Sequence, residues 1–261
     1  MNIIDRFLLT LSYVTALPLK RGKFYDQADD NSLSGLAKYL PSAGAVIGCI
    51  LLGAGALCVS KLHAPNLVSG AVLTVAWIAL TGGLHFDGLM DAADGIFSHR
   101  SRERMLEIML DSRVGNFGAM CGMSVFLLKF AALSSLCCSP KVLYALLVVA
   151  PCWARWTELY AIGRFSYAKE EGKGKIWHDS TKMPEDVLIG LVVPVAVSAA
   201  AAALCGISAI LMISVFACFS GLVASHWLAQ VLRGHTGDTY GAVVELSETG
   251  CLLLTALFCC L

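Results

Sequence analysis

Charged side chains are scarce in this chain: Lys, Arg, Asp and Glu make up only 15% of its 261 residues, whereas a soluble domain carries about a quarter. This deficit argues against a soluble enzyme. Basic and acidic residues are equal in number, 19 of each, so no positive excess favours a nucleic-acid partner. A Walker A loop, a serine-hydrolase elbow and a G-x-G-x-x-G motif after a strand are also missing. The sites that those patterns build are therefore not expected here.

Apolar residues fill the space that charge leaves, at 57% of the chain with a mean hydropathy of +0.72. Runs long enough to span a bilayer, about 20 residues each, recur along its whole length. We predict an all-α polytopic membrane bundle of about seven transmembrane helices, forming a single domain over residues 1–261. The predicted spans are 41–60, 66–84, 115–137, 140–163, 187–204, 206–230 and 241–260. Lys129 and Arg155 interrupt the third and fourth runs, and Glu245 and Glu248 lie in the seventh.

The distribution of charge predicts an orientation. With a cytoplasmic N-terminus, the inner segments are 1–40, 85–114, 164–186 and 231–240, and they hold 15 of the 19 Lys and Arg residues. This is the positive-inside asymmetry of an inserted helical bundle. The outer segments contain no Asp or Glu, so we expect the polar chemistry at the cytoplasmic face.

Two further features bear on placement. Residues 3–14 carry apolar side chains at helical spacing, interrupted by Arg6, and no cleavage pattern follows. We therefore expect a helix rather than a cleavable signal peptide, either lying on the inner membrane surface or packed on the bundle. The 11 cysteines lie mostly inside predicted spans, and none forms a C-x-x-C pair with metal-ligand spacing. Buried free cysteines act as small hydrophobic residues, so packing explains them.

The most informative segment is Thr81-Gly-Gly-Leu-His-Phe-Asp-Gly-Leu-Met-Asp-Ala-Ala-Asp-Gly95, at the end of an apolar run. Asp87, Asp91 and Asp94 are spaced four and three apart, which places them on one face of a helix. Three carboxylates on one face repel each other unless a cation neutralises them, and Mg²⁺ commonly takes one or two protein carboxylates. Asp87 and Asp94 lie about 10 Å apart along a helix axis, so Asp91 is the expected shared ligand. A solvated polar turn is the alternative, and the glycines also permit a broken helix.

A second acidic segment runs from Arg233 to Glu248 and contains Asp238, Glu245 and Glu248, seven and three apart. Like the first, it has a glycine-rich turn and a histidine before the acids enter an apolar helix. We expect the two acidic faces to meet at one cytoplasmic cavity that holds one or two metal ions. A polar helix cap is the alternative.

Basic residues suited to phosphate lie on the same side. Arg113 stands between small residues just before a span, where it can reach a phosphate or serve as a positive-inside anchor. Ser101 is expected to cap an amphipathic helix over 102–111, whose arginines at 100, 102 and 104 face solvent or lipid phosphates. The loop 167–174 is either a lid over phosphates or a solvated loop. Within the fourth span, Arg155 and Glu158 are expected to pair on adjacent turns.

The segment Gly82–Gly95 resembles the signature of the adenosylcobinamide-GDP ribazoletransferases, the cobalamin synthases. So does Arg104-Met-Leu-Glu-Ile-Met-Leu-Asp-Ser-Arg-Val-Gly-Asn-Phe-Gly118. Thr236-Gly-Asp-Thr-Tyr-Gly-Ala-Val-Val-Glu-Leu-Ser-Glu248 is similar to the family's C-terminal motif. The three motifs lie in family order, so the resemblance covers essentially the whole chain. One segment departs from it: the family often reads Arg-Pro-x-Gly-Leu-Gly where this chain has Lys169-Glu-Glu-Gly-Lys-Gly174, and lysine lacks the bidentate fork of arginine.

The resemblance implies a function and its participants. A ribose hydroxyl of α-ribazole, or of its 5′-phosphate, attacks the cobinamide-linked phosphate of adenosylcobinamide-GDP, and GMP leaves with Mg²⁺ required. It implies a multi-pass protein of the bacterial cytoplasmic (inner) membrane, surrounded by lipid, with its active site facing the cytoplasm. A homo-oligomer and docking of other late cobalamin-pathway enzymes are further expected partners.

Site residues follow from the same resemblance. Asp87, Asp91 and Asp94 would hold Mg²⁺ on the diphosphate, helped by Asp238, Glu245 and Glu248. His85 would position or deprotonate the attacking hydroxyl, or order the metal shell. Arg113 is the expected partner of the leaving GMP phosphate.

Three other membrane functions compete with this interpretation. CDP-alcohol phosphotransferases carry D-G-x-x-A-R, whereas Asp87-Gly88 is followed by Leu-Met-Asp-Ala. Polyprenyl transferases use D-x-x-x-D, which Asp87 and Asp91 satisfy, but that short spacing is weakly specific. A cation transporter uses intramembrane acids as a relay and needs polar groups toward the outer face, where this chain has no acids.

Overall fold

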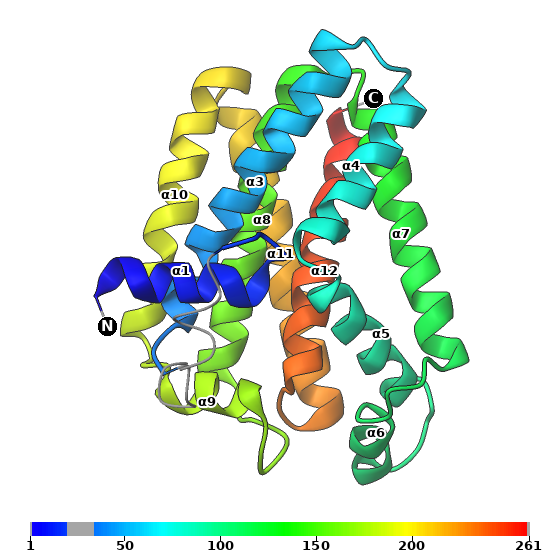
Figure 1. The fold of residues 1–261 in the computed structure, drawn as a ribbon, viewed down its shortest axis with the longest axis vertical. Helices are drawn as coiled ribbons and strands as arrows, with labels where there is room; N and C mark the ends of the chain where they lie inside the picture. Colours follow the sequence, from blue (N-terminus) through cyan, green and yellow to red (C-terminus); the bar gives the residue numbers. More distant parts are fainter. Residues whose placement is uncertain (1, 20–33, 260–261) are drawn as a thin grey trace.

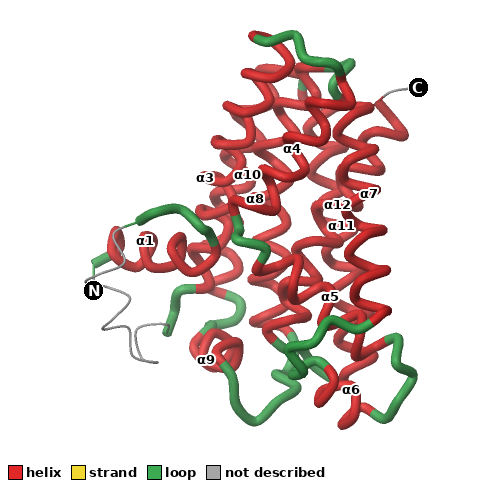
Figure 2. The backbone as a smooth tube through the Cα atoms, turned by 45° about the vertical axis from the view of Figure 1, so that its right-hand side comes forward, coloured by secondary structure: helices red, strands yellow, loops and turns green. Residues whose placement is uncertain are grey.

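The computed structural model describes residues 2–19 and 34–259 and shows an all-helical bundle in that part of the chain (Figures 1 and 2). Six helical segments are each long and apolar enough to cross a membrane. The longest run 25 and 26 residues, or nearly 40 Å at about 1.5 Å per residue. The six segments are α3 (Leu40–Gly55) continued by η3 (Ala56–Lys61), α7 (Asn116–Leu136), α8 (Pro140–Arg164), α10 (Glu185–Cys205), α11 (Ile207–Leu232) and α12 (Gly237–Cys259). The prediction of an all-α multi-pass bundle is confirmed.

The second predicted span, 66–84, is broken rather than straight. Helix α4 (Asn66–Leu80) ends four residues early, and α5 (Leu84–Ile96) leaves it at an angle of 87°. Gly82 and Gly83 make the turn with φ of +61° and +75°, a left-handed backbone that glycine adopts without steric cost. The bend separates the apolar α4 from α5, which carries the three aspartates.

The polar segments gather at one end of the bundle. In Figures 1 and 2, α5, α6 (Arg102–Ile108), α9 (Lys173–Ser180) and the turn between α11 and α12 lie at the same end. The connections from α3 to α4 and from α10 to α11 lie at the opposite end. Three of the four segments that charge placement assigned to one face, 85–114, 164–186 and 231–240, therefore lie together at this end. Of the fourth, 1–40, residues 20–33 fall outside the described part of the chain, and α1 (Ile3–Val14) lies across the bundle (Figures 1 and 2).

Two short helices flank this polar end. Helix α1 (Ile3–Val14) lies across the bundle in Figure 1 and buries Leu9, Leu11 and Val14, while Ile3 and Ile4 stay exposed. It therefore packs on the bundle through its second half. Helix α6 begins after the expected cap, since the Ser101 side chain accepts a hydrogen bond from the Arg104 N–H, but it ends at Ile108 rather than 111.

The expectation that Arg102 faces solvent or lipid phosphates is wrong. Its guanidinium donates to the backbone carbonyls of Leu232 and Ala168. These carbonyls lie near the end of α11 and in the connection that follows α8. The sequence could not reveal this role, because both acceptors are backbone atoms far away along the chain.

The core has two apolar clusters, and α8 contributes to both of them. One cluster lies beneath the polar end and includes Leu159, Ile162 and Trp177. The other includes Trp77, Leu146 and Leu147. Cys152 and Cys251 are fully buried free thiols, in agreement with the packing role expected for cysteines.

Candidate active site

A cavity of about 310 Å³ opens at the polar end, between α1, α5, α8, α9 and α12. The residues between α8 and α9, which we call the 165–172 loop, form one of its walls. Its ionisable or hydroxyl-bearing lining residues are Tyr13, His85, Asp87, Glu158, Tyr167, Lys169, Glu171, Lys173, Asp238 and Tyr240. Carboxylates and lysines thus share a concave surface, which is the usual form of a small-molecule site.

Two glycines allow α5 and α12 to approach closely beside this cavity. A Cβ atom on Gly88 would lie 2.8 Å from the carbonyl oxygen of Asp238, and one on Gly241 would lie 2.9 Å from that of His85. Any larger residue would therefore push the helices apart. This contact brings Asp87 and Asp238, 151 positions apart in the chain, to the same cavity.

Helix α5 places its three aspartates in different surroundings. Asp87 is exposed and lines the cavity, whereas Asp91 is half-buried beside it. The carboxylates of Asp87, Asp238 and Asp94 repel that of Asp91 electrostatically, whereas the ammonium group of Lys169 attracts it. The two acidic segments therefore meet, as expected, through Asp87, Asp91 and Asp238.

Asp94 is occupied by the protein itself. Its two carboxylate oxygens accept hydrogen bonds from the backbone N–H groups of Gly115 and Gly118, each at 2.8 Å. These donors lie at the first turn of α7, where backbone N–H groups lack helical partners. Asp94 thus caps α7, a role that its spacing from Asp91 could not reveal.

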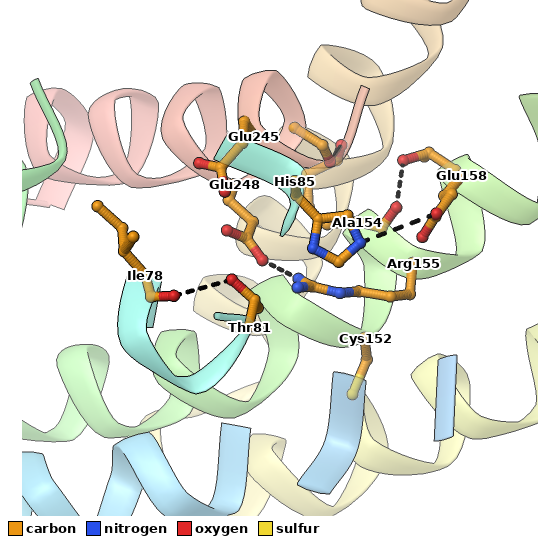
Figure 3. A network of polar contacts seen from close by, with 12 residues as sticks. Ile78, Thr81, His85, Cys152, Ala154, Arg155, Glu158, Glu245 and Glu248 are labelled. Carbon is orange, nitrogen blue, oxygen red and sulfur yellow. Dashed lines mark hydrogen bonds and ion pairs between the residues drawn. The ribbon is translucent and has the colours of Figure 1, made fainter. Parts of the chain in front are cut away.

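Glu245 and Glu248 do not line the cavity. Both are buried, and both bind Lys129 Nζ, at 2.5 and 2.8 Å. Glu248 also pairs with Arg155 (Figure 3). The four residues carry two positive and two negative charges, so they neutralise each other inside the bundle. This explains how α7, α8 and α12 accommodate charge at these positions.

The predicted pair between Arg155 and Glu158 is wrong, because Arg155 binds Glu248 instead. Glu158 is oriented toward His85, with 3.9 Å between Glu158 Oε1 and His85 Nε2 (Figure 3). Both side chains are buried in the cavity wall. Their remaining polar atoms, Glu158 Oε2 and His85 Nδ1, have no hydrogen-bond partner among the described residues.

The 165–172 loop is bound to the turn that leads into α12. The N–H of Ala168 donates to the carbonyl of His235 at 2.7 Å, and the N–H of His235 donates to that of Ser166 at 2.9 Å. Lys169 Nζ pairs with Asp238 Oδ2 at 3.2 Å. Burial raises the pKa of Tyr167 and lowers that of His235 to about 4. The loop therefore forms part of the site rather than a solvated connection.

Arg113 lies outside the cavity. Its side chain is 87% exposed and pairs with Asp111 at 2.6 Å, and this pairing lowers the pKa of Asp111 to about 2. The structure thus brings together His85, Asp87, Asp91 and Asp238, but not Asp94, Arg113, Glu245 or Glu248.

Within the described residues, no group of three or more His, Cys, Asp or Glu side chains is arranged to hold a metal ion. The acids at the cavity nevertheless suit Mg²⁺, which takes one or two carboxylates and completes its shell with water and substrate phosphate. Asp87 and Asp91 form no ion pair in the part of the chain that the structure describes, and Lys169 is the partner of Asp238. A bound dication would complete the neutralisation of these carboxylates.

Comparison with known proteins identifies the family. Residues 6–256 match the family model of cobalamin-5-phosphate synthase. The chain belongs to this family.

Its relatives include proteins named adenosylcobinamide-GDP ribazoletransferase. The relative from Thermosynechococcus vestitus is 39% identical over 232 residues, which cover 86% of each chain. The relative from Acetivibrio thermocellus is 37% identical over 261 residues, covering 99% of this chain and all of that one. No solved structure matches this chain significantly.

In this cobalamin-5-phosphate synthase family member, the cavity is also lined by residues that the sequence does not single out as site residues. Sequence pattern predicts Glu158 in a structural pair, predicts the loop that carries Tyr167 and Lys169 as either a lid or a solvated loop, and predicts no role for Tyr240. For Glu158 a signal was present, since an ionisable residue within an apolar run usually marks function. For the tyrosines no such signal is present, because tyrosine is common both in partly buried loops and in protein cores.

Proposed function

We propose that this chain is an adenosylcobinamide-GDP ribazoletransferase. It transfers the cobinamide phosphate of adenosylcobinamide-GDP to α-ribazole or α-ribazole 5′-phosphate and releases GMP. Family membership and the names of the relatives support the reaction class. The observation that carries the proposal to this chain is the cavity, which presents both carboxylates and lysines.

The diphosphate of the donor is the group that suits this lining. Lys169 and Lys173 can bind phosphate oxygens directly by charge-assisted hydrogen bonds. Asp87 and Asp238, with Asp91 beside them, are the residues that would hold Mg²⁺. An ion held by these residues would help to neutralise the negative charge that develops on the leaving GMP phosphate. We assign the neutralisation of phosphate to the lysines in place of Arg113, because only the lysines line the cavity.

The acceptor must lose a proton when its hydroxyl oxygen forms the new bond to phosphorus. His85 lies in the cavity wall near Asp87, and its Nδ1 has no hydrogen-bond partner among the described residues, so we assign it as the group that receives this proton. The hydroxyl oxygen bonds to the cobinamide-linked phosphorus, the bond from that phosphorus to the GMP oxygen breaks, and GMP leaves. Positioning and electrostatics supply most of the catalysis in such transfers.

We further propose that the N-terminus and the cavity face the cytoplasm of a bacterial inner membrane. The concentration of Lys and Arg in the segments at the polar end supports this orientation. The donor, the acceptor and GMP are all strongly polar, so a site at the aqueous face lets them exchange without crossing the hydrocarbon core.

The test uses membranes that contain this protein, adenosylcobinamide-GDP, either acceptor and Mg²⁺, with GMP release and cobalamin formation followed together. We expect coupled products that require Mg²⁺. The Asp91→Asn variant should lose about 100-fold or more in kcat/KM, because removing one electrostatic stabiliser of a transition state has that effect.

Asp179→Asn is the matched control. Asp179 is an exposed α9 residue that pairs with Lys175 and does not line the cavity, so its loss should leave turnover near that of the parent protein. Absence of product with either acceptor, from correctly inserted protein, would contradict the proposed reaction. Equal losses in both variants would contradict the assignment of the site.

A further inference from the structure

Three segments that are distant in sequence meet at the side chain of Arg102. Arg102 lies at the start of α6, and its Nε donates to the carbonyl of Leu232 at 2.6 Å. Its Nη2 donates to the carbonyl of Ala168 at 2.9 Å. One guanidinium therefore connects α6, the end of α11 and the 165–172 loop, because its planar fork presents several donors in a fixed geometry.

The two carbonyls that Arg102 binds belong to segments that lead to cavity-lining residues. Ala168 precedes Lys169, and the chain turns after Leu232 to reach Asp238 six residues later. In this turn Arg233 has a φ of +53° and Gly234 a φ of +144°. The end of α11 leaves its last carbonyls without helical partners, and Arg102 satisfies one of them.

The same two segments are also joined to each other. Backbone hydrogen bonds link Ser166 and Ala168 to His235, and Lys169 pairs with Asp238 across the cavity. The contacts from Arg102 to both segments, together with the hydrogen bonds between the segments, form a closed ring. Through this ring Arg102, which lies outside the cavity, helps to fix the position of Lys169 relative to Asp238. A shift of either segment would alter the distance between a phosphate-binding cation and a metal-binding carboxylate.

We propose that Arg102 is a positioning residue for donor binding. It fixes the 165–172 loop against the turn before α12, so that Lys169 and Asp238 together bind the diphosphate of the donor substrate. The kinetic part of this inference rests on the proposed function, whereas the structural part does not. Arg102 itself does not line the cavity, so its effect passes through the loop.

Helix α6 offers a matched control two residues away. Arg104 is also an arginine of this helix, but its side chain is 63% exposed and pairs with Glu107 at 2.6 Å. Exposed pairs of this kind contribute little. Arg104→Gln therefore removes the same charge from the same helix without breaking the ring.

The experiment combines hydrogen–deuterium exchange with steady-state kinetics on purified protein in detergent or lipid. In Arg102→Gln we expect faster exchange in peptides covering 165–174 and 231–236, and no change in Arg104→Gln. We expect kcat/KM for the GDP-linked donor to fall about 10- to 100-fold, as displaced binding groups commonly cause. Most of this loss should be an increase of the donor KM, with the acceptor KM unchanged.

Arg102→Lys provides a second variant in case Arg102→Gln does not fold. Lysine keeps the charge but not the planar fork, so we expect intermediate exchange and an intermediate donor KM. Unchanged exchange in both Arg102 variants would overturn the inference, as would equal increases in the donor and acceptor KM. A third outcome separates the two proposals. If the parent protein releases no GMP but Arg102→Gln still shows faster exchange in the loop, the proposed function and the kinetic role of Arg102 are overturned. The structural role of Arg102 in holding the 165–172 loop would then stand.

Discussion

The two acidic segments of this protein have similar sequence patterns, but their carboxylates lie in different environments. On α5, at the polar end of the bundle, Asp87 lines the cavity and Asp91 lies half-buried beside it, and neither forms an ion pair among the described residues. On α12, Asp238 occupies the same cavity, but Glu245 and Glu248 lie two and three turns deeper and bind Lys129 and Arg155. A carboxylate at the aqueous end can remain unpaired and bind a cation from solution, whereas a carboxylate inside the bundle requires a cationic side chain of the same protein.

Removing a partner from the deep cluster should have the largest effect. Glu248→Ala leaves Arg155 buried without its carboxylate, and breaking a buried ion pair in this way costs about 3–5 kcal/mol. We expect the thermal unfolding midpoint to fall and little folded protein to be recovered. The measurement is thermal unfolding in detergent. If Glu248→Ala instead left stability intact while abolishing activity, the assignment of Glu248 to a structural network would be wrong.

The turn before α12 allows a test by pH. Burial lowers the pKa of His235 to about 4, against about 6.5 in an unfolded chain. Between about pH 6.5 and 4, the unfolded state therefore binds a proton at this histidine that the folded state does not bind. The free energy of unfolding is unaffected by this group above about pH 6.5 and decreases as the pH falls from 6.5 toward 4. Denaturant unfolding between pH 7 and 4 should show this loss, and His235→Gln should reduce the slope. An identical pH dependence in both proteins would contradict the buried, neutral histidine.

Asp94 distinguishes the cap from the catalytic face on a single helix. Asp94→Asn keeps only one carbonyl oxygen for the two N–H donors at Gly115 and Gly118, so we expect a loss of about 1 kcal/mol in unfolding free energy. Its kcat/KM should change far less than that of Asp91→Asn. Parallel measurements of unfolding and turnover on both variants make the comparison. Equal losses of activity in Asp94→Asn and Asp91→Asn would support the original prediction that Asp94 is a metal ligand.

Arg113 should show the smallest effect. Because its side chain is exposed, pairs with Asp111 and lies outside the cavity, Arg113→Ala is expected to change kcat/KM by less than about threefold. Lys169→Ala, measured alongside, should raise the donor KM. A large loss in Arg113→Ala with normal Lys169→Ala would reverse our assignment of the phosphate-binding cations.

Much of this arrangement could be predicted from local pattern. Hydropathy predicted the spans, because an apolar run of about 20 residues has few stable alternatives to a membrane helix. The spacing of Asp87, Asp91 and Asp94 predicted a common helical face, and α5 confirms it. The break at Gly82 and Gly83 was permitted by the sequence but not required by it.

Longer-range pairing could not be predicted in this way. Arg155 was expected to bind Glu158, three residues away on the same helix, but binds Glu248 on another. Likewise, Asp94 binds the start of α7, and Arg102 binds two backbone carbonyls. In each case several partners suit the same charge, and only the packing of separate helices selects one of them.

The sequence by itself determined that this protein is a bundle of apolar helices with its polar segments and most of its basic residues at one end, because burial of apolar surface and the cost of charge in hydrocarbon act on each segment locally. Only the tertiary structure decided which acids face the cavity, which neutralise Lys129 and Arg155, and which cap a helix. The physical reason is the close approach of α5 and α12 at Gly88 and Gly241, together with the contacts of both helices with α7 and α8. These contacts set the depth and the neighbours of each carboxylate, and its chemistry follows from them.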